Sequence, residues 1–209
     1  VERFPMLATA GIQTFFNGPE SFTPDDRYIL GEAPELKNFF VAAGFNSVGI
    51  QSAGGAGMVL AEWMETGNAP IDLWDVDIRR MQPFQANLSY LRTRVSETLG
   101  LLYADHFPYR QFASARGVRR SPIHHFLADQ GACFGEVSGW ERANWFLPEE
   151  ALNAGKTAAY EYSWKRQNWF DYSAAEHLAV RQSVGLFDMS SFGKIKIVGR
   201  DAEAVLQRI

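Results

Sequence analysis

The sequence predicts an α+β protein, and three patterns support this class. An apolar run at residues 39–43 is typical of a strand, and it leads through glycine-rich sequence into a helical pattern. A second helical stripe extends from residue 88 to residue 102. Residues 193–199 alternate apolar and polar positions, as a half-buried strand does. Strand and helix periods therefore both occur in one chain.

Composition excludes several classes of function. The 209 residues are 46% hydrophobic, which is enough for real cores. A net charge of −4 argues against nucleic-acid binding through phosphate contacts. No apolar stretch approaches the roughly 20 residues that a membrane-spanning helix needs. The single cysteine, Cys133, excludes an internal disulfide and fits a reducing compartment, such as the bacterial cytoplasm or the mitochondrial matrix.

Both ends of the chain look cut. The start at Val1 is neither an initiator residue nor the beginning of a signal peptide. At the other end Asp201 is a good N-cap for an amphipathic helix over 202–209, and the sequence stops within that helix. We therefore expect an internal fragment of a longer polypeptide.

The N-terminal part is expected to be rich in strands and turns. Residues 12–16 are strand-like, and 17–19 are a strong turn signal. We interpret Asp25 and Asp26 as turn acids. A short strand over 28–30 should end at glycine, and a second should occupy 39–43.

The glycine-rich stretch from Ser52 to Gly57 is predicted to be a turn at the start of a helix that ends at Gly67. A helix start presents free backbone N–H groups and a partial positive charge, so a polar or anionic ligand can approach it closely. The alternative is a packing corner in which glycines only relieve crowding, and for the isolated motif this alternative is favoured.

The central part alternates apolar and acidic residues over 71–78 and then continues into the long helix of 88–102. The apolar stripe of that helix is ordinary core. Arg116, Arg119 and Arg120 form a small basic cluster that we interpret as a solvated loop.

In the last third, His124 and His125 invite a metal interpretation. Neighbouring helical residues point about 100° apart and share an ion poorly, so both are predicted to be structural or surface residues, and no metal site is expected. Ser173 and Glu176 form a capping box that should open a helix over 174–184. Four tryptophans in loop-like sequence are interpreted as packing anchors: Trp140, Trp145, Trp164 and Trp169.

These stretches together resemble a known family. The blocks 17–25, 31–36 and 44–57 are similar to the dimethylglycine and sarcosine dehydrogenases. The block 72–80 resembles the start of their central domain, and 186–194 resembles the opening of their aminomethyltransferase-like, folate-binding domain.

The resemblance implies three domain segments. Residues 1–67 would be the C-terminal end of an FAD-dependent oxidoreductase domain of the D-amino-acid-oxidase type. Residues 68–120 would be a small central domain, and 121–209 the truncated start of a glycine-cleavage T-protein-like domain.

The resemblance also implies FAD as a cofactor and a small methylated amine as the substrate. No GxGxxG motif occurs, so the nucleotide end of FAD would be bound by residues before Val1. This chain would contact the isoalloxazine ring, where helix-start N–H groups favour the negative charge that develops on reduction. The expected contacts are Phe45, Asn46, Ser47, Ser52, Ala53, Gly54, Gly55, Ala56 and Gly57.

Two points stay open at this stage. Asn46 and Ser47 are expected nearest the flavin or substrate, and the equal alternative is that they bond locally within the turn. A tetrahydrofolate site would lie mostly after residue 209, with Phe192 a candidate contact. Neither the catalytic residues nor the electron acceptor can be assigned.

The implied reaction is oxidative demethylation of dimethylglycine or sarcosine, with the one-carbon unit passed to tetrahydrofolate. The fragment alone is expected to be inactive. A non-enzymatic alternative is a regulatory relative that resembles the regulatory subunit of pyruvate dehydrogenase phosphatase, which shares the sequence at 188–192. A stand-alone interaction module is a third, weaker alternative, and no motif in the sequence supports it.

Overall fold

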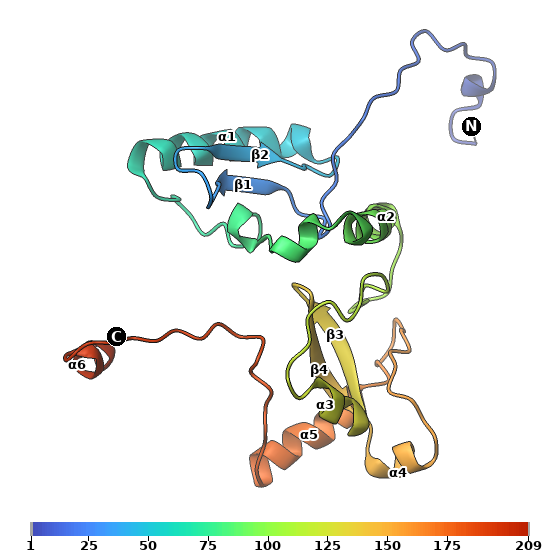
Figure 1. The fold of residues 1–209 in the computed structure, drawn as a ribbon. Coiled ribbons are helices and arrows are strands. Elements are labelled where there is room, and N and C mark those ends of the chain that lie inside the picture. The colour runs from blue at the N-terminus through green and yellow to red at the C-terminus, as the bar shows by residue number, and fades with distance from the viewer. Residues whose placement is uncertain (1, 209) are drawn as a thin grey trace. The chain divides into compact units, whose positions relative to one another are not determined.

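The computed structural model describes residues 2–208 and divides into two compact units (Figure 1). The first unit extends to Gln85 and includes Thr98–Leu102, and the second contains Ala86–Glu97 and the chain from Tyr103 onward. Across the described residues, helices and strands occur together, in agreement with the predicted α+β class. No helix among them is long and apolar enough to cross a membrane.

The first unit is built on a two-stranded antiparallel sheet and one long helix. β1 (Ile29–Glu32) pairs with β2 (Phe40–Ala43), with Leu30 opposite Ala42. α1 (Gly49–Thr66) packs its Ala56, Val59 and Trp63 face inward. These positions are separated by three and four residues, so they form one stripe that covers the sheet.

Shorter elements complete this unit. The 3₁₀ segment η1 (Pro5–Ala8) lies near the N-terminus, and η2 (Ile78–Arg80) and η3 (Pro83–Ala86) follow α1. The strand β1 also forms an isolated parallel bridge through Leu30 and Asp77, where Leu30 N donates to Val76 O at 2.8 Å. The predicted strands at 28–30 and 39–43 are confirmed, although β1 continues through Gly31 to Glu32 instead of ending at the glycine. The helix end at Gly67 is also confirmed. Gly67 has φ +77°, the left-handed conformation that ends a helix.

The second unit is built around the antiparallel hairpin β3 (Ala132–Val137) and β4 (Trp140–Phe146). The preceding helices are α2 (Leu88–Tyr103), of which residues 98–102 belong to the first unit, and α3 (His124–Asp129). The following helices are α4 (Glu149–Asn153), α5 (Phe170–Gln182) and α6 (Ala202–Leu206). α2 confirms the predicted leucine helix, and Asn87 caps its start.

The hairpin packs its apolar face against the segments that follow it. Buried Cys133, Trp145 and Leu147 form the centre of this core. Trp145 stacks on Tyr172 of α5 with ring centroids 5.3 Å apart. The interpretation of the tryptophans as packing anchors is confirmed for Trp145, whereas Trp164 is largely exposed.

Two predicted strands are wrong. Residues 12–16 and 193–199 are not strands in the structure, and their apolar side chains are exposed. A strand is stable only when a neighbour completes its ladder of hydrogen bonds, and within residues 2–208 neither segment has one. The alternation of apolar and polar residues indicates which face of a sheet each side chain would occupy. It does not show whether a second strand lies close enough to pair.

Two further predictions for the last third are wrong. Trp140 and Trp145 lie in β4 rather than in loops. The capping box is absent, because α5 begins at Phe170 and Ser173 is already inside it. Glu176 accepts a hydrogen bond from Phe146 N at 2.7 Å instead. Asp201 does occupy the N-cap position of α6, but its side chain makes no capping hydrogen bond.

Candidate functional site

The β2–α1 corner is the connection between the sheet and the long helix of the first unit. Its residues Gly44, Asn46 and Ser47 all have left-handed backbone conformations, with φ of +65°, +49° and +65°. Glycine and asparagine adopt this conformation at low cost, whereas serine does so less readily. Phe45 stacks on Tyr28 with ring centroids 4.8 Å apart. Consecutive residues in the left-handed conformation strain the backbone, so surrounding contacts must stabilise this conformation.

Asn46 holds the corner through its side-chain amide. The residue is only 2% exposed. Its Oδ1 accepts from Thr23 N at 2.8 Å, and its Nδ2 donates to Gly44 O at 2.8 Å and to Thr23 Oγ1 at 3.1 Å. Both hydrogens of the amide are therefore used by the protein. This geometry supports the local alternative for the side chain of Asn46, which can influence a ligand only by setting the shape of the turn.

Ser47 differs from its neighbour. Its side chain is exposed, and no partner for its hydroxyl is found in the described part of the chain. It therefore keeps hydrogen-bonding capacity for a ligand. Its contact with a cofactor stays a prediction.

The helix begins earlier than predicted. α1 begins at Gly49, so the stretch Ser52–Gly57 lies inside the helix and is not a turn. Ser52 N already donates to Val48 O at 3.1 Å. The correction has a physical reason: glycines lower helix propensity, but burial of Ala56, Val59 and Trp63 outweighs that cost.

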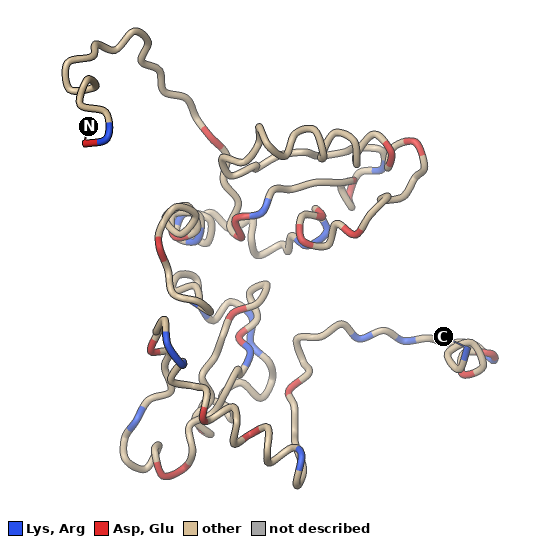
Figure 2. Tube along the Cα trace, turned by 180° about the vertical axis from the view of Figure 1, so that it is seen from behind, with Lys and Arg blue, Asp and Glu red and all other residues tan. Residues whose placement is uncertain are grey.

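The free backbone donors consequently lie upstream of the glycines. The amides of Gly49, Ile50 and Gln51 have no hydrogen-bond acceptor within residues 2–208. The first turn of α1 contains no acidic side chain, and the first charged residue of the helix is Glu62. The helix is accordingly tan over most of its length in Figure 2. An 18-residue helix with bare N–H groups and no nearby carboxylate offers an uncompensated partial positive charge.

The glycines of the first unit fall into two groups. An added Cβ at Gly31 would lie 2.8 Å from the Trp63 ring, and one at Gly44 would lie 2.6 Å from Thr23 Cγ2. These two glycines relieve crowding. At Gly54, Gly55 and Gly57 an added Cβ would meet nothing within 4 Å. Packing among the described residues therefore does not explain the glycines of α1, and their face is open to another molecule or segment.

Charged groups connect η2, which follows α1, to the turn that precedes β1. Asp25 forms an ion pair with Arg80, with Oδ2 2.7 Å from Nε, and Arg80 Nη2 also donates to Arg27 O at 2.6 Å. Burial opposes ionisation of Asp77, but the hydrogen bonds and charge of Arg79 outweigh it and lower the pKa of this carboxyl. Asp25 and Asp26 lie at a turn, as predicted, and the ion pair adds a structural role for Asp25.

In the second unit the basic cluster is a solvated loop in part: Arg116 and Arg120 are exposed, as predicted, but Arg116 is also held by an ion pair. Arg116 Nε and Nη2 bind the two carboxylate oxygens of buried Glu141, at 2.9 and 2.5 Å, and Gly117 N donates to Oε1 at 2.5 Å. The guanidinium of Arg119 lies 4.3 Å from the centre of the Trp140 ring. The prediction missed the ion pair because Glu141 lies 25 positions after Arg116 in sequence.

The histidines behave as predicted. His124 stacks on Phe134 with ring centroids 4.2 Å apart, and His125 is exposed. The part of the chain that the structure describes contains no group of three or more side chains that could hold a metal ion.

Three family models match successive parts of the chain. Residues 1–63 match the model described as FAD dependent oxidoreductase, and residues 66–121 match the FAD dependent oxidoreductase central domain. Residues 123–209 match the GCVT N-terminal domain. The corner and α1 up to Trp63 therefore lie within the first matched segment.

Curated relatives match along almost the whole chain. A 4-methylaminobutanoate oxidase (formaldehyde-forming) of Paenarthrobacter nicotinovorans is 50% identical over 97% of this chain and 24% of its own length. The mitochondrial sarcosine dehydrogenase of Mus musculus is 36% identical, with the same two coverages. The mitochondrial pyruvate dehydrogenase phosphatase regulatory subunit of Mus musculus is 37% identical over 98% of this chain and 23% of its own length. The chain thus spans about a quarter of the length of these relatives.

Proposed function

Because the chain belongs to the family of FAD-dependent amine oxidoreductases fused to an aminomethyltransferase-like domain, we propose that its protein oxidises an N-methyl group of a methylated amino acid. In this reaction the methyl carbon loses a hydride and an iminium forms on the substrate. FAD, when bound, supplies the two-electron acceptor. The one-carbon unit then leaves as formaldehyde after reaction with water, or is passed to tetrahydrofolate.

The observation that carries the proposal is the start of α1. The amides of Gly49, Ile50 and Gln51 are unused within residues 2–208, and they precede a helix without an acidic first turn. Such donors stabilise an electron-rich ligand edge, and the open space at Gly54 and Gly55 would let a flat ring approach the helix. The residues present therefore fit FAD.

The roles of the protein groups follow from this arrangement. The amides of Gly49–Gln51 would donate to the edge of the cofactor where negative charge develops, and they cost no reorganisation because the helix holds them. Asn46 would orient them by fixing the corner through Thr23. Ser47, whose hydroxyl has no partner among the described residues, remains able to hydrogen bond to cofactor or substrate.

The first experiment uses the full-length protein that carries this chain. We expect a yellow protein whose flavin absorption is bleached by sarcosine, dimethylglycine or 4-methylaminobutanoate. Formaldehyde should accumulate without tetrahydrofolate and should decrease when tetrahydrofolate is added. A flavin-containing protein that releases equal formaldehyde in both cases would refute the transfer to folate but not the oxidation.

The similarity to the regulatory subunit of pyruvate dehydrogenase phosphatase favours a second function, that of a non-catalytic binding partner. A colourless full-length protein that none of the three amines affects would support this function and exclude the first.

The second experiment tests the role of the helix. We expect Gly54→Val to reduce the flavin content or the rate of reduction, because a branched side chain would hold a ring away from α1. The matched control is Ala61→Val, at another exposed position of the same helix. Valine has a higher helix propensity than glycine, so Gly54→Val should fold. Unchanged flavin content and reduction rate in Gly54→Val would show that the glycine face does not contact the cofactor.

A further inference from the structure

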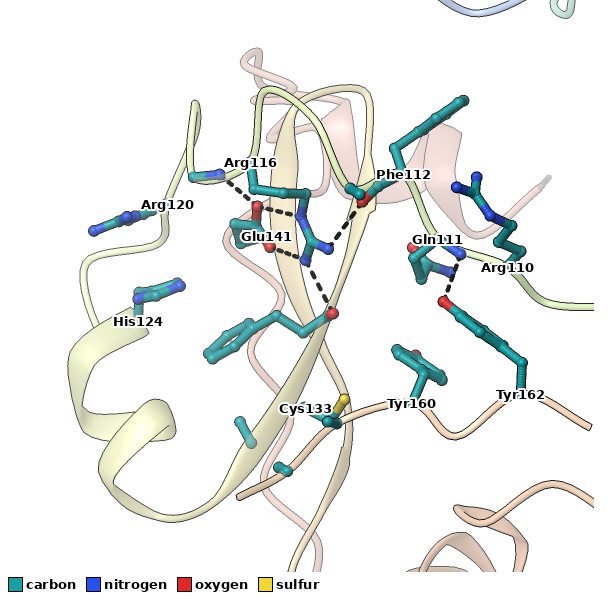
Figure 3. Close-up of a pocket in the computed structure, with 16 residues that line it drawn as sticks. Arg110, Gln111, Phe112, Arg116, Arg120, His124, Cys133, Glu141, Tyr160 and Tyr162 are labelled. Atoms are coloured by element: carbon teal, nitrogen blue, oxygen red, sulfur yellow. Dashed lines mark hydrogen bonds and ion pairs between the residues drawn. The ribbon is translucent and has the colours of Figure 1, made fainter. Parts of the chain in front are cut away.

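A cavity of about 590 Å³ lies beside the β3–β4 hairpin, wholly within the second unit (Figure 3). It is bounded by the loop of residues 110–120, the start of α3, strand β3 and residues 158–162. Its volume falls within the range of about 300–1,000 Å³ that is usual for small-molecule sites. The function proposed above makes no use of this cavity.

Two of the three arginines that line the cavity are already neutralised. Arg116 is held in a bidentate ion pair by Glu141 and also donates to Phe112 O and Phe134 O, as the dashed lines of Figure 3 show. Arg110 Nη1 lies 3.4 Å from Glu97 Oε1. Neither guanidinium therefore brings an uncompensated charge to the cavity.

Arg120 is the exception. No carboxylate lies within ion-pair distance of its guanidinium in the described chain, and no hydrogen-bond partner is found for it there. Its Nη2 lies against Gly117, 2.6 Å from the position that a Cβ would occupy. Gly117 has φ +73°, so a side chain at this position would be strained and would displace the guanidinium. The glycine thus provides the space in which Arg120 sits.

The other titratable groups of the cavity add no negative charge at neutral pH. Burial raises the pKa of the Cys133 thiol to about 11, so this group stays protonated. Burial, followed by the charge of Arg120, lowers the pKa of His124. His124 Nδ1 is buried without a hydrogen-bond partner in residues 2–208. One positive charge, on the exposed Arg120, is left without a counter-charge from the described residues.

The walls of the cavity are aromatic. His124 stacks on Phe134, and Tyr160 stacks on Tyr162 with ring centroids 5.6 Å apart. Tyr160 Oη accepts from Asn144 Nδ2 at 2.7 Å, and Tyr162 Oη accepts from Gln111 N at 2.8 Å. Each phenol can still donate its own hydrogen, because an accepted bond leaves the O–H free. The two tyrosines thus combine flat apolar faces with available donors.

We propose that this cavity binds a small carboxylate with a flat apolar body, with Arg120 as the anchor for the carboxylate. A guanidinium without a partner is a strong donor to a planar carboxylate, and stacked rings favour a flat body over a compact ion. The proposal goes beyond the amine oxidation proposed above and does not depend on it, because it concerns residues of the second unit alone.

The test measures binding of benzoate and benzamide to the full-length protein by titration calorimetry. We expect saturable binding of benzoate that is at least about tenfold weaker in Arg120→Gln, because a charge-assisted hydrogen bond is lost. The matched control is Arg119→Gln, since Arg119 is adjacent in sequence, stacks on Trp140 and does not line the cavity. This control should change the affinity by less than about twofold.

Several outcomes would overturn the proposal. They are equal loss of benzoate affinity in Arg120→Gln and Arg119→Gln, equal affinity for benzamide and benzoate, or tighter binding of inorganic phosphate than of benzoate. Crystals soaked in 4-bromobenzoate give an independent measurement through the anomalous signal of bromine. A bromine peak between Arg120 and the tyrosines supports the site. A well-folded protein whose only peaks lie elsewhere refutes it, including a site near α1.

Discussion

The two hairpins of the protein are stabilised by different chemistry. In the first unit, β1 and β2 pack on the apolar stripe of α1, and the connection is fixed by the neutral amide of Asn46. In the second unit, β3 and β4 are held by ion pairs with buried carboxylates, in which Arg94 binds Glu136 and Arg116 binds Glu141. We call the hydrogen bonds of Asn46 the neutral clasp, and the ion pairs Arg94–Glu136 and Arg116–Glu141 the charged clasps. The neutral clasp adds no negative charge that would compensate the partial positive charge at the start of α1. In the charged clasps, each carboxylate is already bound by an arginine.

The difference shows where each unit keeps capacity for a ligand. A carboxylate near the start of α1 would occupy its free amides, and the first turn contains none. In the second unit Glu97 and Glu141 are bound by Arg110 and Arg116, and Arg120 has no ion-pair partner among the described residues. In both units, the groups that stabilise the hairpin thus differ from the groups that remain able to bind a ligand. The following predictions test this difference.

The largest effect is expected for Glu141→Gln. Removing the buried carboxylate charge leaves the Arg116 guanidinium without its counter-charge, and we expect a loss of about 3 kcal/mol in the local free energy of opening. Hydrogen exchange of peptides from residues 132–146 in the full-length protein measures this loss. Glu149→Gln, at an exposed position of α4, should change it by less than about 0.5 kcal/mol. Unchanged exchange in Glu141→Gln would show that the ion pair does not stabilise the hairpin.

The second prediction compares glycines within the first unit. Gly31→Ala should destabilise it by about 2 kcal/mol, because φ is +121° and the new Cβ would collide with the Trp63 ring. Gly54→Ala should instead stabilise α1 by about 0.5–1 kcal/mol, since the helix gains propensity and nothing is crowded. Hydrogen exchange in α1 distinguishes the two. A loss of protection in Gly54→Ala would mean that the open face is needed for folding.

The charged clasp should also respond to acid. Burial opposes ionisation of Glu141, but its hydrogen bonds to Arg116 and Gly117 outweigh it and hold its pKa below the ordinary 4.5. The stabilisation is therefore complete above pH 4.5 and is lost as the pH falls through the lowered pKa. The Asn46 clasp contains no titratable group, so it should not weaken with Glu141. Exchange at the hairpin, corrected for the intrinsic pH dependence, should accelerate in this range, and Glu141→Gln should abolish the effect.

Local sequence predicted the elements whose contacts are local. The helix end at Gly67, the helix over 88–102 and the strands before α1 all depend on residues within a few positions. The start of α1 was misplaced because tertiary burial of Ala56 and Val59 overrode the glycine signal.

The β3–β4 hairpin could not be read from sequence for a different reason. Its strands include Glu136 and Glu141, which look like exposed charges until their arginine partners are known. Arg94 lies 42 positions before Glu136, a separation that no periodic pattern encodes. The cavity beside the hairpin was missed for the same reason, since its walls come from segments that are distant in sequence.

The smallest expected effect concerns Asp26, in the turn that Asn46 holds. Burial, followed by the charge of Asp25, raises the pKa of the Asp26 carboxyl, and its Oδ1 is buried without a partner in residues 2–208. A raised pKa means that the folded state binds the proton more tightly, so this group destabilises the turn at neutral pH and the cost disappears as the pH falls. Acid should therefore tighten this turn as the pH falls toward 3.8, whereas it loosens the Glu141 clasp below pH 4.5.

Asp26→Asn removes the charge and suits the left-handed backbone, for which φ is +61°. We expect it to stabilise the turn by about 0.5 kcal/mol at pH 7 and to have no effect at pH 3, where the aspartate is already protonated. Asp25→Asn is the contrasting variant, because it removes the ion pair with Arg80 and should destabilise the same segment. Hydrogen exchange of residues 21–30 at both pH values measures the two effects. Equal destabilisation by both variants at pH 7 would mean that the negative charge of Asp26 stabilises the turn, and that the neutral clasp at Asn46 depends on it.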